Sequence, residues 1–210
     1  MRGHLIPILL MTMVNALPQS VVPPTDAAAT AVGKGKFTIR SNLSIHARAN
    51  RLIPVVVGGV QDVFVPNFVT AAVGDVIQFQ FSAGNHTVTE STADAACQPL
   101  QATVPEAIHS GHIPFETGST MVGTFNMPVT TTDPVFIYCA TGPHCQEGQV
   151  MIVNPTSEQQ LLDYAELSAA TEASVDGTTV SGGTVGQIPL ADAAFTAPPA
   201  EEEAPAAPAA

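Results

Sequence analysis

The sequence contains no tryptophan, only three cysteines, and no lysine or arginine beyond Arg51. Charged residues make up 11% of the 210 residues, and acidic residues outnumber basic ones by 18 to 6. A surface with so few cations would repel phosphate backbones and anionic headgroups, which argues against binding to nucleic acid or to a membrane surface. We expect a contact surface that suits a neutral or cationic partner, or acidity that serves only solubility.

Helical bundles are also disfavoured, because 18 prolines and 16 glycines punctuate the chain. Residues 1–16 have the pattern of a secretory signal peptide: Arg2, then an apolar stretch too short to span a bilayer, then a small-residue cleavage site at Ala16. Residues 17–51 predict a flexible leader, rich in proline and alanine and then basic. We expect one folded domain over residues 52–155, a helix over 156–170, and a disordered acidic and Ala-Pro tail over 171–210.

The folded domain is predicted to be all-β. The segment Val76–Phe81 alternates apolar and polar residues, which is the period of a half-buried strand. Residues 121–125, 135–139 and 150–153 predict further strands, separated by Pro, Gly, Asn or Asp. Short strands with frequent turns indicate a Greek-key β-sandwich, here with a short C-terminal helix and disordered ends.

One segment carries the candidate chemistry. A predicted strand ends at Cys139, a Gly-Pro turn leads to His144, and Gln149 begins the next strand. This hairpin brings together a thiolate, an imidazole and an amide oxygen. His86 follows the strand that ends at Phe81 and supplies a second imidazole. Copper that cycles between Cu(I) and Cu(II) favours two imidazoles and one thiolate, with a long axial contact from Met or Gln.

The three cysteines fit this interpretation. With Cys139 as the thiolate ligand, Cys97 and Cys145 remain to form one disulfide. The alternative pairing of Cys139 with Cys145 would consume the ligand and leave Cys97 alone. Met151 shares a strand face with Gln149 and is the alternative axial ligand.

These residues resemble the cupredoxins, specifically the phytocyanin-like extracellular proteins of fungi. The resemblance covers about residues 55–155 and rests on the Asn85-His86-Thr87-Val88 stretch and on the Cys139-x4-His144-Cys145-x3-Gln149 loop. It implies His86, Cys139 and His144 as equatorial ligands of one type 1 copper ion and Cys97–Cys145 as the disulfide. It also implies an axial Gln149, as in stellacyanin-like proteins, and with it a lower reduction potential than Met would give.

The resulting hypothesis is a secreted, monomeric blue copper protein, outside the cell or in its wall, that transfers single electrons to an unknown redox partner. The sequence shows no Ser-His-Asp set, paired carboxylate site or phosphate loop that would indicate an enzyme. It also lacks the His-x-His pairs of a multicopper oxidase. The alternative is a non-redox interaction or copper-buffering protein on the same fold. We do not expect a membrane span.

Two further features remain open. His109 and His112 lie in a Pro- and Gly-rich insert and are interpreted as loop histidines, with an extra metal site as the alternative. Asn42 and Asn85 begin glycosylation sequons. Asn42 suits an exposed leader, whereas Asn85 adjoins a candidate ligand.

Overall fold

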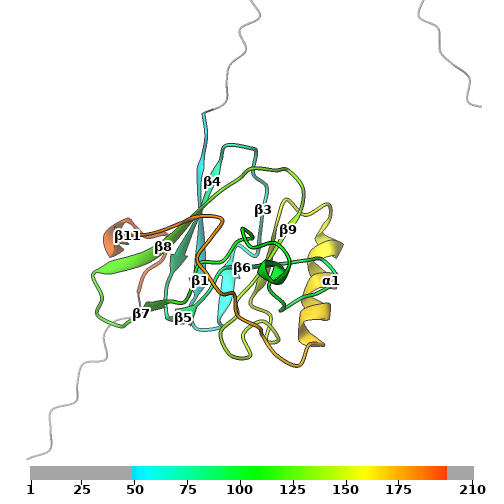
Figure 1. Cartoon of the computed structure of the whole chain (residues 1–210). Coiled ribbons are helices and arrows are strands. Elements are labelled where there is room, and N and C mark those ends of the chain that lie inside the picture. Colours follow the sequence, from blue (N-terminus) through cyan, green and yellow to red (C-terminus); the bar gives the residue numbers. More distant parts are fainter. Residues whose placement is uncertain (1–48, 198–210) are drawn as a thin grey trace, which may run out of the picture. The chain divides into compact units, whose positions relative to one another are not determined.

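The computed structural model describes residues 49–197, which form two facing β-sheets and a helix on the outer side of the second sheet (Figure 1). The first sheet has the order β11-β8-β4-β1-β2, with bounds Thr184–Pro189, Met121–Pro128, Val76–Phe81, Leu52–Gly58 and Val63–Val65. The second has the order β3-β10-β9-β6, with bounds Phe68–Val69, Val150–Val153, Val135–Tyr138 and Thr89–Ser91. A separate ladder pairs β5 with β7, with bounds Gly84–His86 and Ile113–Phe115. The predicted all-β sandwich is confirmed.

The core between the sheets follows from the alternation in β4. Ile77, Phe79 and Phe81 are fully buried, as the period of two predicts. On the other face of β4, Gln78 donates a side-chain hydrogen bond to Asn126 of β8 at 3.0 Å. β4 runs parallel to β1 and antiparallel to β8, so the central strand of this sheet is paired along both edges.

The second sheet is buried on both faces, which decides where Cys139 points. Phe136 and Tyr138 of β9 pack outward in a cluster that includes Tyr164 of the helix. Ile137, and Cys139 directly after the strand, belong instead to the core between the sheets. Since successive side chains of a strand point to opposite faces, the phase of β9 places the thiol inside the sandwich.

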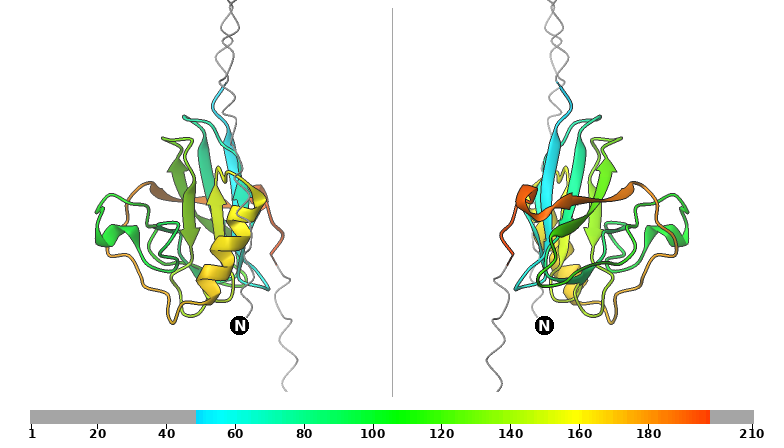
Figure 2. Two further views of the ribbon diagram at one scale, coloured as in Figure 1. Left: turned by 90° about the vertical axis from the view of Figure 1, so that its right-hand side faces the viewer. Right: turned by 90° about the vertical axis from the view of Figure 1, so that its left-hand side faces the viewer.

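Helix α1 spans Glu158–Ala169, within the predicted range 156–170, and covers the outer face of the second sheet (Figure 2). Ser157 caps its N-terminus, because the Ser157 hydroxyl accepts a hydrogen bond from the Gln160 amide. Leu161 and Tyr164 are buried against the sheet. Two short 3-10 turns, Leu100–Ala102 and Leu190–Asp192, complete the elements.

The segment 171–197 is ordered, so the prediction of disorder is wrong for this part of the 171–210 tail. Its strand β11 pairs with β8 in a six-residue antiparallel register, from Thr184↔Asn126 to Pro189↔Met121. Gly183 packs so closely that an added Cβ would come within 2.6 Å of the Phe125 ring. The absence of a side chain at Gly183 therefore lets the chain pack beside Phe125 just before β11 pairs with the edge of the sheet.

Some predictions fall on residues that the structure does not describe. The signal peptide over 1–16, nearly all of the leader over 17–51, Asn42 and residues 198–210 are outside the described range. Among residues 49–197, no helix combines the length and the apolarity needed to cross a bilayer.

Candidate metal centre

The four predicted ligands meet at one end of the sandwich. His86 ends β5, Cys139 directly follows β9, and His144 lies in the loop that leads to Gln149, directly before β10. Two backbone hydrogen bonds close this loop: Cys139 N–H donates to Gln149 O at 3.0 Å, and Gln149 N–H donates to His144 O at 2.8 Å. The hairpin predicted from sequence thus brings together three of the candidate ligands.

The donor atoms are spaced as a trigonal metal site requires. Cys139 Sγ lies 3.8 Å from His86 Nδ1 and 3.6 Å from His144 Nδ1. One donor atom from each of these residues lies within 4.8 Å of the other two. An ion with bonds of about 2.0 Å to nitrogen and about 2.3 Å to sulfur, in a trigonal plane, would separate N from S by about 3.7 Å. The observed spacing fits such an ion without rearrangement.

His86 presents the correct nitrogen. Its Nε2 lies 2.6 Å from Ala83 O, and because a carbonyl can only accept, Nε2 of the neutral ring carries the proton. The lone pair of Nδ1 therefore faces Cys139 Sγ and Gln149 Oε1, the latter at 3.0 Å. Two facing lone pairs repel each other unless a cation or a proton lies between them. Burial also lowers the His86 pKa, which favours the neutral form that can bind a metal.

Cys139 is the only free cysteine, and its side chain is fully buried. Burial raises the pKa of the Cys139 thiol, while hydrogen bonds from Thr87 and Thr141 oppose that rise. The Thr87 amide donates to Cys139 Sγ at 3.4 Å. A buried sulfur with a raised pKa is a weak nucleophile, but a bound cation would favour the thiolate and so couple metal binding to proton release.

Two glycines make room for the His86 ring. A Cβ on Gly58 would come within 2.5 Å of both Ala83 O and His86 Nε2, and a Cβ on Gly84 within 2.9 Å of Nε2. Both glycines have positive φ, 92° and 83°. The sequence reasoning did not identify these positions, although the Gly58-Gly59 pair at the end of a strand was a visible turn signal.

Asp62 was also missed by the sequence reasoning. It lies in the loop between β1 and β2, with Oδ1 3.5 Å from His86 Nε2 and Oδ2 3.8 Å from His144 Nε2. Its carboxylate therefore faces the remote nitrogens of both candidate imidazole ligands. Carboxylates in this position orient metal-binding histidines and raise their basicity. No spacing rule in the sequence marks Asp62, because the contact depends on the fold of the loop.

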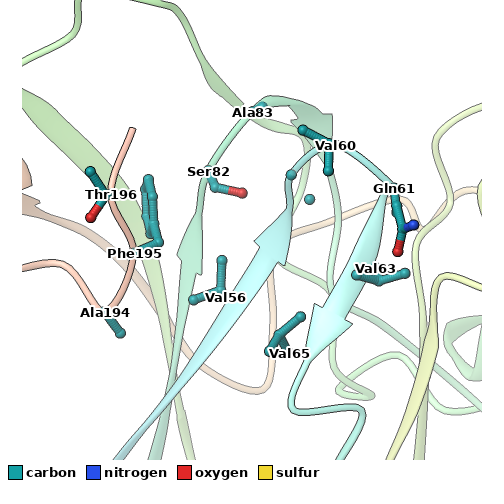
Figure 3. Close-up of a pocket in the computed structure, with 12 residues that line it drawn as sticks. Val56, Val60, Gln61, Val63, Val65, Ser82, Ala83, Ala194, Phe195 and Thr196 are labelled. Atoms are coloured by element: carbon teal, nitrogen blue, oxygen red, sulfur yellow. The ribbon is translucent and has the colours of Figure 1, made fainter. Parts of the chain in front are cut away.

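The same loop borders an open pocket of about 510 Å³ (Figure 3). Its lining is mostly apolar and includes Val56, Val63, Val65 and Phe195. Gly58 and Ala83, which lie next to Nε2 of His86, also line the pocket. None of the lining residues carries a titratable side chain, so the pocket adds no acid–base chemistry to the site.

The other two cysteines form the disulfide Cys97–Cys145. The predicted pairing is thus present in the structure, and the alternative between Cys139 and Cys145 is not. Because Cys145 follows His144 directly, this bond anchors the ligand loop to the segment after β6. Met151 packs in the core between the sheets, whereas Gln149 is the residue that contacts His86. The arrangement favours Gln149 over Met151 as the axial donor.

The histidines of the insert form a separate group. His109 is buried and His112 is partly exposed, and each places Nε2 near Asp176, at 3.5 Å and 2.8 Å. Among the described residues, His86, Cys139 and His144 are the only group of three His, Cys, Asp or Glu residues whose donor atoms all lie within 4.8 Å of one another. The interpretation as loop histidines stays a prediction, in which His109 is hydrogen-bonded to Thr89 and His112 to Asp176. Asn85 is exposed on β5, beside the buried His86.

Comparison with known proteins finds two similar fungal proteins. The chain is 28% identical over 107 residues to the probable GPI-anchored cupredoxin-1 of Arthroderma benhamiae, which covers 51% of this chain and 52% of that relative. The chain is cupredoxin-like and is similar to this fungal relative. It is also 35% identical over 140 residues to an extracellular serine-rich protein of the same fungus, which covers 66% of this chain and 53% of the relative. This cupredoxin-like chain thus spans about half the length of the curated relatives that it matches.

The chain was also compared with solved structures and with models of protein families. The purple cupredoxin from Nitrosopumilus maritimus superimposes on 48% of the cupredoxin-like chain and 96% of its own, with 11% identity and a TM-score of 0.36. No family model matches the sequence.

Proposed function

We propose that this chain binds one copper ion as a type 1 site and carries single electrons as a secreted protein, outside the cell or in its wall. His86, Cys139 and His144 would hold the ion in their plane, with Gln149 as the weak axial donor. The observation that carries the proposal is the triangle of Nδ1, Sγ and Nδ1 atoms with edges of 3.6 Å and 3.8 Å to sulfur. Copper bound there would supply a one-electron Cu(II)/Cu(I) couple.

The rest of the site supports electron transfer rather than substrate chemistry. His86 and Cys139 are fully buried, and the protein presents only the partly exposed ring of His144 toward solvent. Such enclosure leaves little space for a substrate at the ion. It would also hold the ligands in one geometry when the ion changes between Cu(II) and Cu(I). The names of the two fungal relatives, one extracellular and one a probable GPI-anchored cupredoxin, support a location outside the cell.

The test is to add Cu(II) to the purified protein and record its visible absorption and electron spin resonance spectra. We expect an intense thiolate-to-copper band that ascorbate abolishes and reoxidation restores. Cys139→Ser should lose the band, because a hydroxyl cannot replace the thiolate. Met151→Leu is the matched control, a buried change of similar volume outside the ligand set, and should keep it.

The outcomes separate the two candidate functions. Tight copper binding without reversible reduction would favour a copper-buffering or interaction protein. A wild-type protein that gives the same spectrum as Cys139→Ser would overturn the type 1 site.

A further inference from the structure

His109 is a buried titratable residue that the proposed copper site does not use. Its Nδ1 lies 3.0 Å from Thr89 Oγ1, and its Nε2 lies 3.5 Å from Asp176 Oδ1. Gly177 packs against the ring so tightly that an added Cβ would come within 2.5 Å of it. Backbone hydrogen bonds with Ser181 in both directions hold the residue. The imidazole is therefore fixed with one nitrogen toward the interior and one toward Asp176.

Hydrogen bonds continue from His109 to the segment that carries the thiol. Thr89 Oγ1 lies 2.8 Å from Thr87 Oγ1, and the Thr87 hydroxyl accepts from the Ala140 amide at 2.8 Å. The backbone amide of Thr87 donates to Cys139 Sγ. His109, Thr89 and Thr87 thus form a continuous buried path to Cys139 and to the residue that follows it.

The direction of this path depends on the charge of His109. In the neutral ring with the proton on Nε2, Nδ1 accepts from the Thr89 hydroxyl. Thr89 in turn accepts from the Thr87 hydroxyl, and Thr87 accepts from the Ala140 amide. Each N–H or O–H group in this path donates once, and each donates to the next residue in the direction of Asp176.

Protonation of His109 reverses the path. Nδ1 then donates to Thr89 Oγ1, so the Thr89 hydroxyl must donate to Thr87. The Thr87 hydroxyl proton has to turn to another acceptor, and the sulfur of Cys139 is close. A hydrogen bond from the Thr87 side chain lowers the pKa of the Cys139 thiol.

We propose that His109 is a positioning residue that controls the hydrogen bonding of the Cys139 sulfur through Thr89 and Thr87. This inference rests on the proposed copper site for its functional meaning. A hydrogen bond to the thiolate withdraws electron density from the metal–sulfur bond and favours the reduced ion. With copper bound, proton uptake by His109 would therefore raise the reduction potential, and by linkage reduction would favour protonation of His109 by the same factor.

The groups around His109 determine the pH at which it takes up a proton. Burial lowers the pKa of His109, and the nearby His112 acts in the same direction, while the Asp176 carboxylate opposes both. Glu90 on β6 is the other charged group nearby, and it accepts a hydrogen bond from the Ile108 amide next to His109. Burial raises the pKa of Glu90. The response should therefore appear at a pH below the usual histidine pKa of about 6.5.

The first experiment needs no metal. In the copper-free protein, the Ala140 amide signal should titrate in nuclear magnetic resonance spectra with the same midpoint as the His109 ring, because Thr87 changes its hydrogen bonding at that pH. Thr89→Val should abolish the Ala140 titration while His109 still titrates. Thr89→Ser restores the hydroxyl and should restore the coupling. His112→Gln is the matched control and should keep it.

The second experiment uses the Cu(II) protein. The thiolate-to-copper band of the wild type should shift across the His109 titration, and the shift should be lost in Thr89→Val and in His109→Gln. An Ala140 signal that stays constant in the wild type, or that titrates unchanged in His109→Gln, overturns the inference even if Thr89→Val does not fold. A protein that shows the Ala140 coupling but forms no blue site contradicts the proposed function instead.

Discussion

The side-chain oxygen of Gln149 faces Nδ1 of His86 at 3.0 Å, while the nitrogen of the same amide is buried without a hydrogen-bond partner among the described residues. A buried amide normally satisfies its N–H groups before its oxygen approaches another lone pair. This orientation is the one that would serve a cation between the two acceptors. In this orientation Gln149 is available as the proposed axial donor.

Gln149→Met should retain copper and raise the reduction potential. A thioether is a softer axial donor than an amide oxygen, and it stabilises Cu(I) relative to Cu(II). The replacement also removes the unpartnered Nε2, so the copper-free protein should lose no stability. Voltammetry of the copper protein measures the potential. Met151→Leu is the control, and an equal shift in that variant would mean that Met151 is the axial ligand.

Gly58→Ala should disturb the site far more than Gly59→Ala. Both glycines have positive φ, 92° and 98°, so both changes carry the left-handed backbone cost of about 1–2 kcal/mol. Only at Gly58 would the new methyl group meet Ala83 O and the His86 ring, whereas at Gly59 the nearest atom is 3.9 Å away. We expect an additional loss of about 1–3 kcal/mol in the free energy of unfolding for Gly58→Ala.

Urea unfolding of the copper-free variants measures this difference, and the visible spectrum after Cu(II) addition reports the His86 geometry. If the two variants unfold with the same free energy and give the same spectrum, Gly58 has no steric role behind His86.

The candidate ligand set could be named from the sequence because three of its members, Cys139, His144 and Gln149, lie in one hairpin. The sequence predicted the sandwich because alternation in Val76–Phe81 is a strong signal. It could not predict the contact of Asp62, which depends on a loop whose backbone is left-handed at that residue, with φ of 47°. The strand Thr184–Pro189 was missed for a different reason. It is an edge strand without a buried residue, ordered by backbone pairing with β8 rather than by a hydrophobic face.

Alkaline solution should destabilise the protein through Tyr164. Burial raises the pKa of Tyr164 above its usual value near 10, and its hydroxyl lies 2.7 Å from Ser91 Oγ. The folded protein therefore keeps a proton that the unfolded chain loses. The stability from this group is complete below about pH 10 and falls as pH rises, by about 1.4 kcal/mol per pH unit.

Unfolding experiments between pH 9 and 11.5 measure this slope. Tyr164→Phe should make this slope less steep by the contribution of one proton, about 1.4 kcal/mol per pH unit. Tyr138→Phe provides a parallel test, because burial raises the Tyr138 pKa too. An unchanged slope in Tyr164→Phe would show that the phenol ionises equally in both states.

Replacing both Cys97 and Cys145 by alanine should lower the free energy of unfolding by about 4 kcal/mol. The bond closes a loop with a sequence separation of 48, and the chain entropy released to the unfolded state gives this magnitude. His144 precedes Cys145, so copper affinity should fall as well. Denaturant unfolding of the copper-free protein measures the first effect. Cys139→Ala, which leaves the loop closed, is the control and should cost less than half as much.

Asp62→Asn should weaken Cu(II) binding by up to about tenfold and raise the reduction potential. The carboxylate lies 3.5 Å from His86 Nε2 and 3.8 Å from His144 Nε2, so its charge stabilises the more positive oxidised ion. The side chain is 41% exposed, and added salt should therefore reduce the difference from wild type.

Competition with a copper chelator measures the affinity, and voltammetry at low and high ionic strength measures the potential. Glu147→Gln removes one negative charge from the ligand loop and serves as the matched control. If Glu147→Gln shifts the potential as much as Asp62→Asn does, the effect comes from net charge alone. A larger shift for Asp62→Asn, reduced by salt, would identify the carboxylate at the two imidazoles as its source.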